Sequence, residues 1–382
     1  MVKLTFSSHV FDFALHPSEH IAVTGLITGE IECHRFGQTD NQRLWAVKPT
    51  KKSCRGVDFS CDGNELYSIS RDRSINTINI ETGEVLNKHK AAHESPINKV
   101  KRLNEKLLAT GDDMGIIKIW DTRSHGLIHE YNEHSDFIAD MTFSAAKNTL
   151  ISVAGDGNLS VWDIRKPKLV AMSDCMDDEL LSAVIVKNEK KVVVGSQSGV
   201  LNLWTWGDWG DSSDRVLGHP SSIDTICKLD EDTVCTGSSD GIIRVVSILP
   251  NKFEGVIGAH GEDFPIERLQ LSYDNAWLGS CAHDNSIRFW DVRFLFNEED
   301  ETASVASDSG KESSESDGAF QHKSDSDGGG DGDGSNSGSD SDSDDADSYR
   351  FSDRDDSDEA ERAPRRKRRM THKSNGNFFE GL

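Results

Sequence analysis

A histidine, a serine and an aspartate recur in the same order at two places in this chain. The two sets are His134, Ser152 and Asp156, and His260, Ser280 and Asp284. These residue types together could carry out nucleophilic catalysis, in which a base activates a hydroxyl, and histidine is also a common metal ligand. A tryptophan closes each set, however, at Trp162 and Trp290. Tryptophan has no role in such chemistry, so the sets need a second interpretation.

A further catalytic candidate is the segment Gly-Ser-Ser-Asp-Gly at residues 237–241, which fits the Gly-x-Ser-x-Gly elbow of serine hydrolases. That elbow requires a strand, a sharp turn and then a helix. Here a second strand pattern, Ile242-Ile243-Arg244-Val245, follows the turn. We therefore interpret the segment as a turn between two strands and expect no enzymatic activity from it.

The spacing of the tryptophans indicates a repeat. Seven strand patterns end 42 to 44 residues apart, at His34-Arg35, Ile78-Asn79, Trp120-Asp121, Trp162-Asp163, Trp204-Thr205, Val246-Ser247 and Trp290-Asp291. Such a period with a Trp-Asp ending is typical of a β-propeller built from WD repeats. In those repeats histidine, serine, aspartate and tryptophan form a hydrogen-bonded tetrad. We accordingly interpret His134, Ser152, Asp156 and Trp162, and His260, Ser280, Asp284 and Trp290, as structural.

This period predicts an all-β fold with three regions. Residues 1–296 should form a seven-bladed propeller, and residues 2–6 should supply the outer strand that the last repeat lacks, which removes an exposed sheet edge. Residues 297–361 are rich in Asp, Ser and Gly, so we expect disorder there. Residues 362–382 should form a basic targeting segment and a short docking peptide.

Composition restricts the possible functions. The 382 residues carry a net charge of −24, and residues 297–382 alone contain 24 acidic and 11 basic side chains. This balance argues against broad binding to nucleic-acid backbones. The seven scattered cysteines include no Cys-x-x-Cys pair, so we expect neither a disulfide framework nor a metal site, and no cofactor. Because no signal peptide or long apolar stretch is present, we expect an intracellular protein without membrane contact.

The last 86 residues contain three candidate functional sequences. Several serines precede an acidic residue by three positions and are candidates for phosphorylation by an acid-directed kinase: Ser324, Ser339 and Ser341. A basic block predicts nuclear or nucleolar import: Arg365, Arg366, Lys367, Arg368 and Arg369. It could also fold back on the acidic tract. The apolar residues at the end predict a docking peptide: Phe378, Phe379 and Leu382.

Charges on the expected loops suggest where a partner binds. The loops of blades two and three carry a basic sector, which comprises Lys51, Lys52, Arg55, Arg71, Arg73, Lys88 and Lys90, with Lys48 and His93 beside it. The equivalent loops of blades four and five are acidic. We hypothesise that one face is electrically split and that its basic sector meets an acidic protein, an RNA backbone or the protein's own tail. An ordinary solvated mixture of charges is the alternative.

Four segments resemble the WD repeat-containing protein 55 family, as does the order of propeller, acidic tract, basic block and Phe-Phe end. The segments are residues 206–210, 218–225, 235–244 and 262–267. This resemblance implies a non-enzymatic nuclear or nucleolar scaffold in ribosomal RNA processing and large-subunit assembly. Its partners would be pre-ribosomal assembly factors, with RNA contact through the particle. The protein would be a monomer within this larger complex and would have no small-molecule substrate.

Three repeat ends also resemble the Trp-Asp-x-Arg box with which substrate receptors of cullin-4 ubiquitin ligases bind the ligase adaptor. The arginines that would make this contact are Arg123, Arg165 and Arg293. The box is common among WD repeats that bind no ligase. A ligase receptor is therefore the alternative function.

Overall fold

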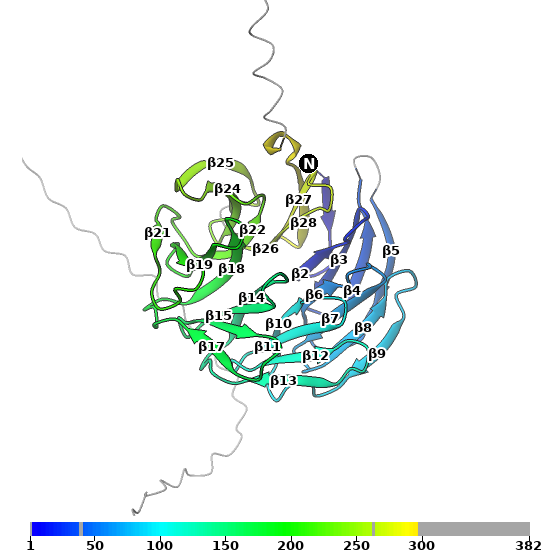
Figure 1. The fold of residues 1–382 in the computed structure, drawn as a ribbon. Helices are drawn as coiled ribbons and strands as arrows, with labels where there is room; N and C mark the ends of the chain where they lie inside the picture. Colours follow the sequence, from blue (N-terminus) through cyan, green and yellow to red (C-terminus); the bar gives the residue numbers. More distant parts are fainter. Residues whose placement is uncertain (1, 38–40, 262–263, 297–382) are drawn as a thin grey trace, which may run out of the picture. The chain divides into compact units, whose positions relative to one another are not determined.

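The computed structural model describes residues 2–37, 41–261 and 264–296, which form a seven-bladed β-propeller (Figure 1). Each blade is an antiparallel sheet of four strands, and the seven sheets are arranged around a central axis. The only helix in these ranges is one short 3₁₀ turn at Arg293–Leu295. The predicted fold class is confirmed.

The strands occupy equivalent positions in each blade. The innermost strands are β2 (Val10–Leu15), β6 (Cys54–Phe59), β10 (Ile97–Arg102), β14 (Ile138–Ser144), β18 (Leu180–Val186), β22 (Ile223–Lys228) and β26 (Ile266–Leu271). The second strands are β3 (Ile21–Leu26), β7 (Glu65–Ser70), β11 (Leu107–Asp112), β15 (Thr149–Ala154), β19 (Lys191–Ser196), β23 (Thr233–Ser238) and β27 (Trp277–Ala282).

The third strands carry the repeat endings, and the fourth strands form the rim. The third strands are β4 (Ile31–Arg35), β8 (Ile75–Asn79), β12 (Ile117–Asp121), β16 (Leu159–Asp163), β20 (Leu201–Thr205), β24 (Ile242–Ser247) and β28 (Ser286–Asp291). The outer strands are β5 (Gln42–Val47), β9 (Val85–His89), β13 (Leu127–Tyr131), β17 (Leu169–Met172), β21 (Asp214–Val216), β25 (Lys252–Ala259) and β1 (Val2–Thr5).

Burial differs between the second and the outer strands. In β19, Val192, Val193 and Val194 are all fully buried because neighbouring sheets cover both faces of the strand. Such a strand is apolar at successive positions, as in any sheet covered on both sides. In contrast, the outer strand β5 is mostly exposed and includes Gln42 and Arg43. The core therefore lies between the blades rather than along the rim.

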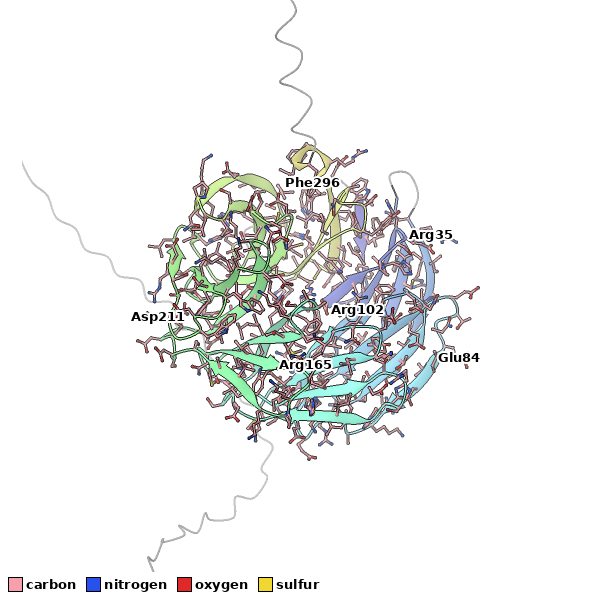
Figure 2. All side chains as sticks on the ribbon, in the orientation of Figure 1. Arg35, Glu84, Arg102, Arg165, Asp211 and Phe296 are labelled. Atoms are coloured by element: carbon pink, nitrogen blue, oxygen red, sulfur yellow. The ribbon has the colours of Figure 1, made fainter. Side chains whose placement is uncertain are left out.

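Aromatic side chains join neighbouring blades across these interfaces. The Trp162 ring of blade four is stacked on Tyr131 of blade three, with ring centroids 4.3 Å apart. Phe36 of blade one is stacked on Phe289 of blade seven at 4.0 Å. Side chains fill the spaces between the sheets around the ring (Figure 2). Each blade is therefore stabilised mainly by the blades beside it.

The N-terminal strand closes the ring. Strand β1 pairs antiparallel with β28, with Val2 opposite Phe289. Val2 and Leu4 point into the core while Lys3 and Thr5 face outwards, as the alternation of a half-buried strand requires. The Phe6 N–H then donates to the Asn285 carbonyl at 2.9 Å. The last sheet thus contains the first and the last strand of the propeller.

A β-bulge occurs at the same position between the first and second strands of all seven blades. Each bulge leaves one residue of the innermost strand without a partner in the register: Phe11, Arg55, Asn98, Ala139, Leu181, Asp224 and Glu267. A bulge turns a side chain away from the regular pleat. The bulge residues Phe11, Arg55, Asn98 and Glu267 line one central hollow.

The bulges define the two faces of the propeller. We call the face next to them the bulge face. Because successive strands run antiparallel, this face also bears the segments that enter each blade and the turns between second and third strands. The turns between first and second strands, and between third and fourth strands, lie on the opposite face. The basic sector falls on the bulge face and the Trp-Asp-x-Arg arginines fall on the opposite face.

Candidate functional site

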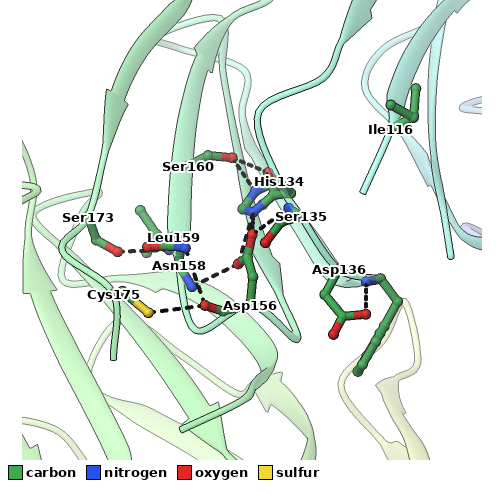
Figure 3. A network of polar contacts seen from close by, with 12 residues as sticks. Ile116, His134, Ser135, Asp136, Asp156, Asn158, Leu159, Ser160, Ser173 and Cys175 are labelled. Atoms are coloured by element: carbon green, nitrogen blue, oxygen red, sulfur yellow. Dashed lines mark hydrogen bonds and ion pairs between the residues drawn. The ribbon is translucent and has the colours of Figure 1, made fainter. Parts of the chain in front are cut away.

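The tetrad of blade four is a closed hydrogen-bond network, and Figure 3 shows the part of it formed by His134, Asp156 and Ser160. His134 Nδ1 lies 3.1 Å from Asp156 Oδ2, and His134 Nε2 lies 2.7 Å from Ser160 Oγ and 3.3 Å from Ser152 Oγ. The Trp162 Nε1–H donates to the same two hydroxyls at 2.7 and 3.1 Å. Both hydroxyls are fully buried and bonded to each other. They hold the blade together and are not free to attack a substrate.

Blade seven contains the same network. His260 Nδ1 lies 3.2 Å from Asp284 Oδ2, and its Nε2 lies 2.7 Å from Ser280 Oγ. Ser280 Oγ also accepts the indole N–H of Trp290 at 2.8 Å. Arg288 donates to Asp284 as well, at 2.7 Å. Each side chain of the tetrad thus has a partner, which avoids a penalty of about 1–3 kcal/mol per unpaired group.

Blade three has a tetrad that the sequence analysis missed. His93 lies 2.9 Å from Asp112 and 2.7 Å from Thr110 Oγ1, which accepts the Trp120 N–H at 2.8 Å. The placement of His93 beside the basic sector was wrong, since its side chain is fully buried. Threonine in the serine position obscured this set. Ser160 of blade four was missed as well, because a second hydroxyl two residues before the tryptophan is not part of the usual pattern.

Blade six has lost its tryptophan and has a different network. His219 Nε2 lies 2.8 Å from Thr236 Oγ1, but among the described residues its Nδ1 has no partner. Asp240 binds Arg244 at 2.6 Å instead of the histidine. Burial, together with the charge of Arg244, lowers the pKa of His219 to about 4. This histidine is therefore neutral at physiological pH.

The hydrolase-like segment at 237–241 comprises the end of β23 and the turn that joins it to β24. Its central serine, Ser239, binds the hydroxyl of Ser222 at 2.7 Å. No helix follows the turn, so the strand–turn–helix geometry of a nucleophile elbow is absent from this segment. The interpretation of the segment as a turn agrees with this geometry.

Four lysines of blade two surround a hollow on the bulge face, which we call the basic hollow. Its lining comprises Lys48, Pro49, Thr50, Lys51, Lys52, Asp72 and Lys88. Lys51 and Lys52 are exposed, whereas Lys88 is partly buried, donates to the Pro49 carbonyl at 2.7 Å and lies 3.5 Å from Asp72. Asp72 is the single carboxylate in the lining, so the hollow carries net positive charge.

The remaining members of the basic sector lie around this hollow but differ in their surroundings. Arg71 and Arg73, in the turn between β7 and β8, and Lys90 are exposed. Arg55 is a bulge residue in the central hollow, where it binds Asp113 of blade three at 2.6 Å. Its charge is therefore largely neutralised. The charge available to a partner comes from the lysines and from Arg71 and Arg73.

Blades four and five present an acidic hollow on the same face. Its lining includes Asp174, Asp177, Asp178 and Asp211, with Arg215 as the only basic side chain. Asp178 accepts the hydroxyl and the backbone N–H of Ser198. The bulge face thus carries hollows of opposite charge on different blades.

The three Trp-Asp-x-Arg boxes have one common geometry on the opposite face. Each arginine binds the aspartate two residues before it through Nε and a terminal nitrogen, as Arg165 does to Asp163 at 2.7 and 2.8 Å. Arg123 binds Asp121 and Arg293 binds Asp291 in the same way. These contacts lower the pKa values of Asp121 and Asp291 to about 2. The arginine side chains remain 56–65% exposed.

The candidate phosphorylation, import and docking sequences at Ser324, Arg365–Arg369 and Phe378 lie outside the described residues. Among the residues that are described, no helix has the length and apolar character needed to span a membrane.

Known proteins share this repeat architecture. The chain matches the WDR55 family model over residues 2–295. It is 41% identical to WD repeat-containing protein JIP5 of Coprinopsis cinerea, with 78% of this chain and 76% of the relative covered. It is 39% identical to WD repeat-containing protein 55 of Arabidopsis thaliana (82% and 88% covered) and 37% identical to that of Mus musculus (74% and 73%). Like these relatives it is a WD-repeat protein, a class that typically acts as a scaffold without catalysis. The chain therefore belongs to the WDR55 family.

Proposed function

We propose that the protein is a non-enzymatic nuclear and nucleolar scaffold that acts in ribosomal RNA processing and large-subunit assembly. The observation that carries the proposal is the split bulge face, where the basic hollow of blade two and the acidic hollow of blades four and five offer separate docking sites. A propeller with buried tetrads is suited to holding partners in a fixed arrangement. Membership of the WDR55 family supports the scaffold role.

The charges favour protein partners over free RNA. The chain has a net charge of −24, which opposes sequence-independent binding to a phosphate backbone. Opposite charges across an interface speed association and select partners. The basic hollow suits an acidic segment of an assembly factor, and RNA would be approached within the particle. The protein would act there as a monomer, without a cofactor.

The experiment is purification of the tagged full-length chain from nucleoli, followed by sedimentation against ribosomal precursors. Reversal of the exposed charges in Lys51→Glu, Lys52→Glu, Arg71→Glu and Arg73→Glu should move the protein from the precursor fractions to the top of the gradient. A matched control reverses four exposed lysines of the opposite face: Lys106, Lys166, Lys168 and Lys190. It changes the net charge equally and should leave sedimentation unchanged.

Two results would refute this proposal. One is co-sedimentation of the first variant with precursors at the wild-type level. The other is equal loss in both variants, which would indicate a general effect of charge rather than a docking site. Melting temperatures of both variants show whether the propeller remains folded.

One observation favours a second function, that of a cullin-4 ligase receptor. Arg123, Arg165 and Arg293 are presented in the same exposed geometry on three blades. If the boxes are used, Arg123→Ala with Arg165→Ala should abolish co-purification of the ligase adaptor and leave precursor association intact. Arg43→Ala, an exposed arginine of the outer strand β5, is the control. Unchanged adaptor recovery in the double variant would exclude this function.

We assign three roles to the segment at 297–382. The block Arg365–Arg369 would direct nuclear import, Ser324, Ser339 and Ser341 would accept phosphate, and Phe378, Phe379 and Leu382 would dock on a partner. Replacing the five basic residues with alanine should leave the protein in the cytoplasm, as seen by fluorescence microscopy. Mass spectrometry of the purified chain tests the serines. Phe378→Ala with Phe379→Ala should reduce partner recovery without altering localisation.

A further inference from the structure

Two neighbouring blades place acidic bulge residues at the centre of the bulge face. The bulge residue of blade six is Asp224 and that of blade seven is Glu267. The other five bulge residues include no carboxylate. Each bulge turns its side chain out of the regular pleat, so both carboxylates are directed away from the sheet register. Blades six and seven thus differ from the other five in carrying a carboxylate at the bulge.

Two histidines lie beside Glu267 although they are distant from each other in the sequence. His9 immediately precedes β2, and His283 follows β27, the second strand of blade seven. Their rings are in edge contact with centroids 4.4 Å apart. One ligand atom from each of His9, Glu267 and His283 lies within 4.8 Å of the other two. His283 Nε2 is 2.5 Å from Glu267 Oε1.

The backbone holds these side chains in place. Glu267 is the bulge residue of β26, and its neighbours Ile266 and Arg268 are both paired with β27. The His9 carbonyl accepts the N–H of Ile27 at 3.0 Å, and Phe6 N–H donates to the carbonyl of Asn285, two residues after His283. Strand β2 of blade one lies beside β26 and β27 of blade seven where the ring closes (Figure 1). The cluster is therefore built on strand ends and short turns.

The neighbouring arginine does not occupy the cluster. Arg268, which follows Glu267 in β26, is engaged by Asp12 at 3.5 Å. Among the described residues, the ion-pair partner of Glu267 is His283.

We propose that His9, Glu267 and His283 form a binding site for a divalent transition-metal ion, best suited to zinc, with a water molecule as the fourth ligand. Two histidines with one glutamate are an established ligand set for zinc, which prefers four ligands at about 2.0–2.2 Å in a tetrahedron. Donor atoms around such an ion are roughly 3.4 Å apart, so the cluster needs only small side-chain movements. The ion would tie the segment after β1 to blade seven and so stabilise ring closure.

The test is titration of the metal-free full-length chain with Zn²⁺ against a chromophoric chelator. His9→Gln with His283→Gln should lower the affinity of one zinc equivalent at least about tenfold, because even outer-shell changes reduce metal affinity by about 10–100-fold. Glu267→Gln should weaken the same equivalent. His129→Gln, a partly buried histidine on the outer strand β13, is the matched control and should bind as the wild type does.

Co²⁺ gives a second readout that does not depend on stability. The wild type should show the visible bands of a tetrahedral ion without thiolate charge-transfer bands, and the double histidine variant should lack them. Zinc should also raise the melting temperature of the wild type and not that of the variant. Equal affinity and equal spectra in the wild type and the double variant would overturn the proposal, as would a thiolate spectrum, which would place the ion on cysteine.

Discussion

Trp162 and Trp204 provide a matched test of how much the tetrads stabilise the propeller. Both tryptophans are the penultimate residues of the third strands of their blades, and both are essentially fully buried. The Trp162 N–H binds two serine hydroxyls, whereas the Trp204 N–H has no partner among the described residues. Replacing either with phenylalanine removes a similar volume from the core. The two variants therefore differ mainly in the hydrogen bonds lost.

The magnitude follows from the partners. Trp162→Phe loses a net contribution of about 0.5–1.5 kcal/mol for each of two hydrogen bonds, whereas Trp204→Phe removes an unsatisfied donor that costs about 1–3 kcal/mol. If the cost of the smaller ring is similar at both sites, Trp162→Phe should be the less stable variant by about 2–6 kcal/mol.

Urea denaturation monitored by circular dichroism, with a common slope for all variants, measures this difference as a shift in midpoint. Thermal melting should give the same order. The reasoning is refuted if the two variants lose equal stability or if Trp204→Phe is the less stable one. Either result would mean that packing of the indole outweighs its hydrogen bonds.

Three further predictions concern ring closure, a turn and pH. Deleting residues 2–8 removes three buried side chains worth about 1.5–3 kcal/mol each, so the melting temperature should fall. The deletion also exposes the edge of β28, so the monomer peak in size-exclusion chromatography should decrease. Deleting residues 376–382 is the control and should change neither measurement. Gly63→Ala should lower the free energy of unfolding by at least about 2 kcal/mol in urea denaturation, because Gly63 has φ +77° and a Cβ would lie 2.2 Å from His16 Nε2. Gly255→Ala, which has open space around it, is the control and should lower it by less than half of that amount. Equal losses in the two variants would contradict the argument. The folded-state pKa of His219, about 4, is below its usual 6.5, so the unfolded chain takes up the proton first as the pH falls. The free energy of unfolding that neutral His219 contributes is therefore complete above pH 6.5. It is lost towards pH 4, by up to about 3 kcal/mol. His219→Gln should flatten the stability–pH curve in that window, and an unchanged slope would rule out this histidine as its source.

The period of the closing positions was sufficient to predict seven blades, because spacing persists where the residues themselves change. Blade six shows this best, since Val246 replaces the tryptophan and yet β24 keeps its place. The spacing specifies the strands because each blade must bury one interface on each side, and this requirement tolerates many apolar residues. It does not require a particular polar set.

The polar networks were less predictable because they depend on which side chains meet across strands. Thr110 serves in blade three where serine serves in blades four and seven, so pattern matching overlooked its tetrad. Lys88 and Arg55 were grouped by charge alone, but the fold pairs them with Asp72 and Asp113. The bulges depend on register, which no single residue type signals. His9 and His283 therefore gave no indication in the sequence that they meet.

The pairing of β1 with β28 also has a consequence for timing during synthesis. About 280 residues separate the two strands, and at about 5–20 residues per second a ribosome needs roughly 15–60 s to make them. During that interval β1 has no partner and β2 has no blade seven beside it. The four-residue length of β1 and its outward Lys3 and Thr5 limit wrong pairing while it waits. The ring can therefore close only after the last blade has left the ribosome, so every earlier blade must persist for that time as an open arc.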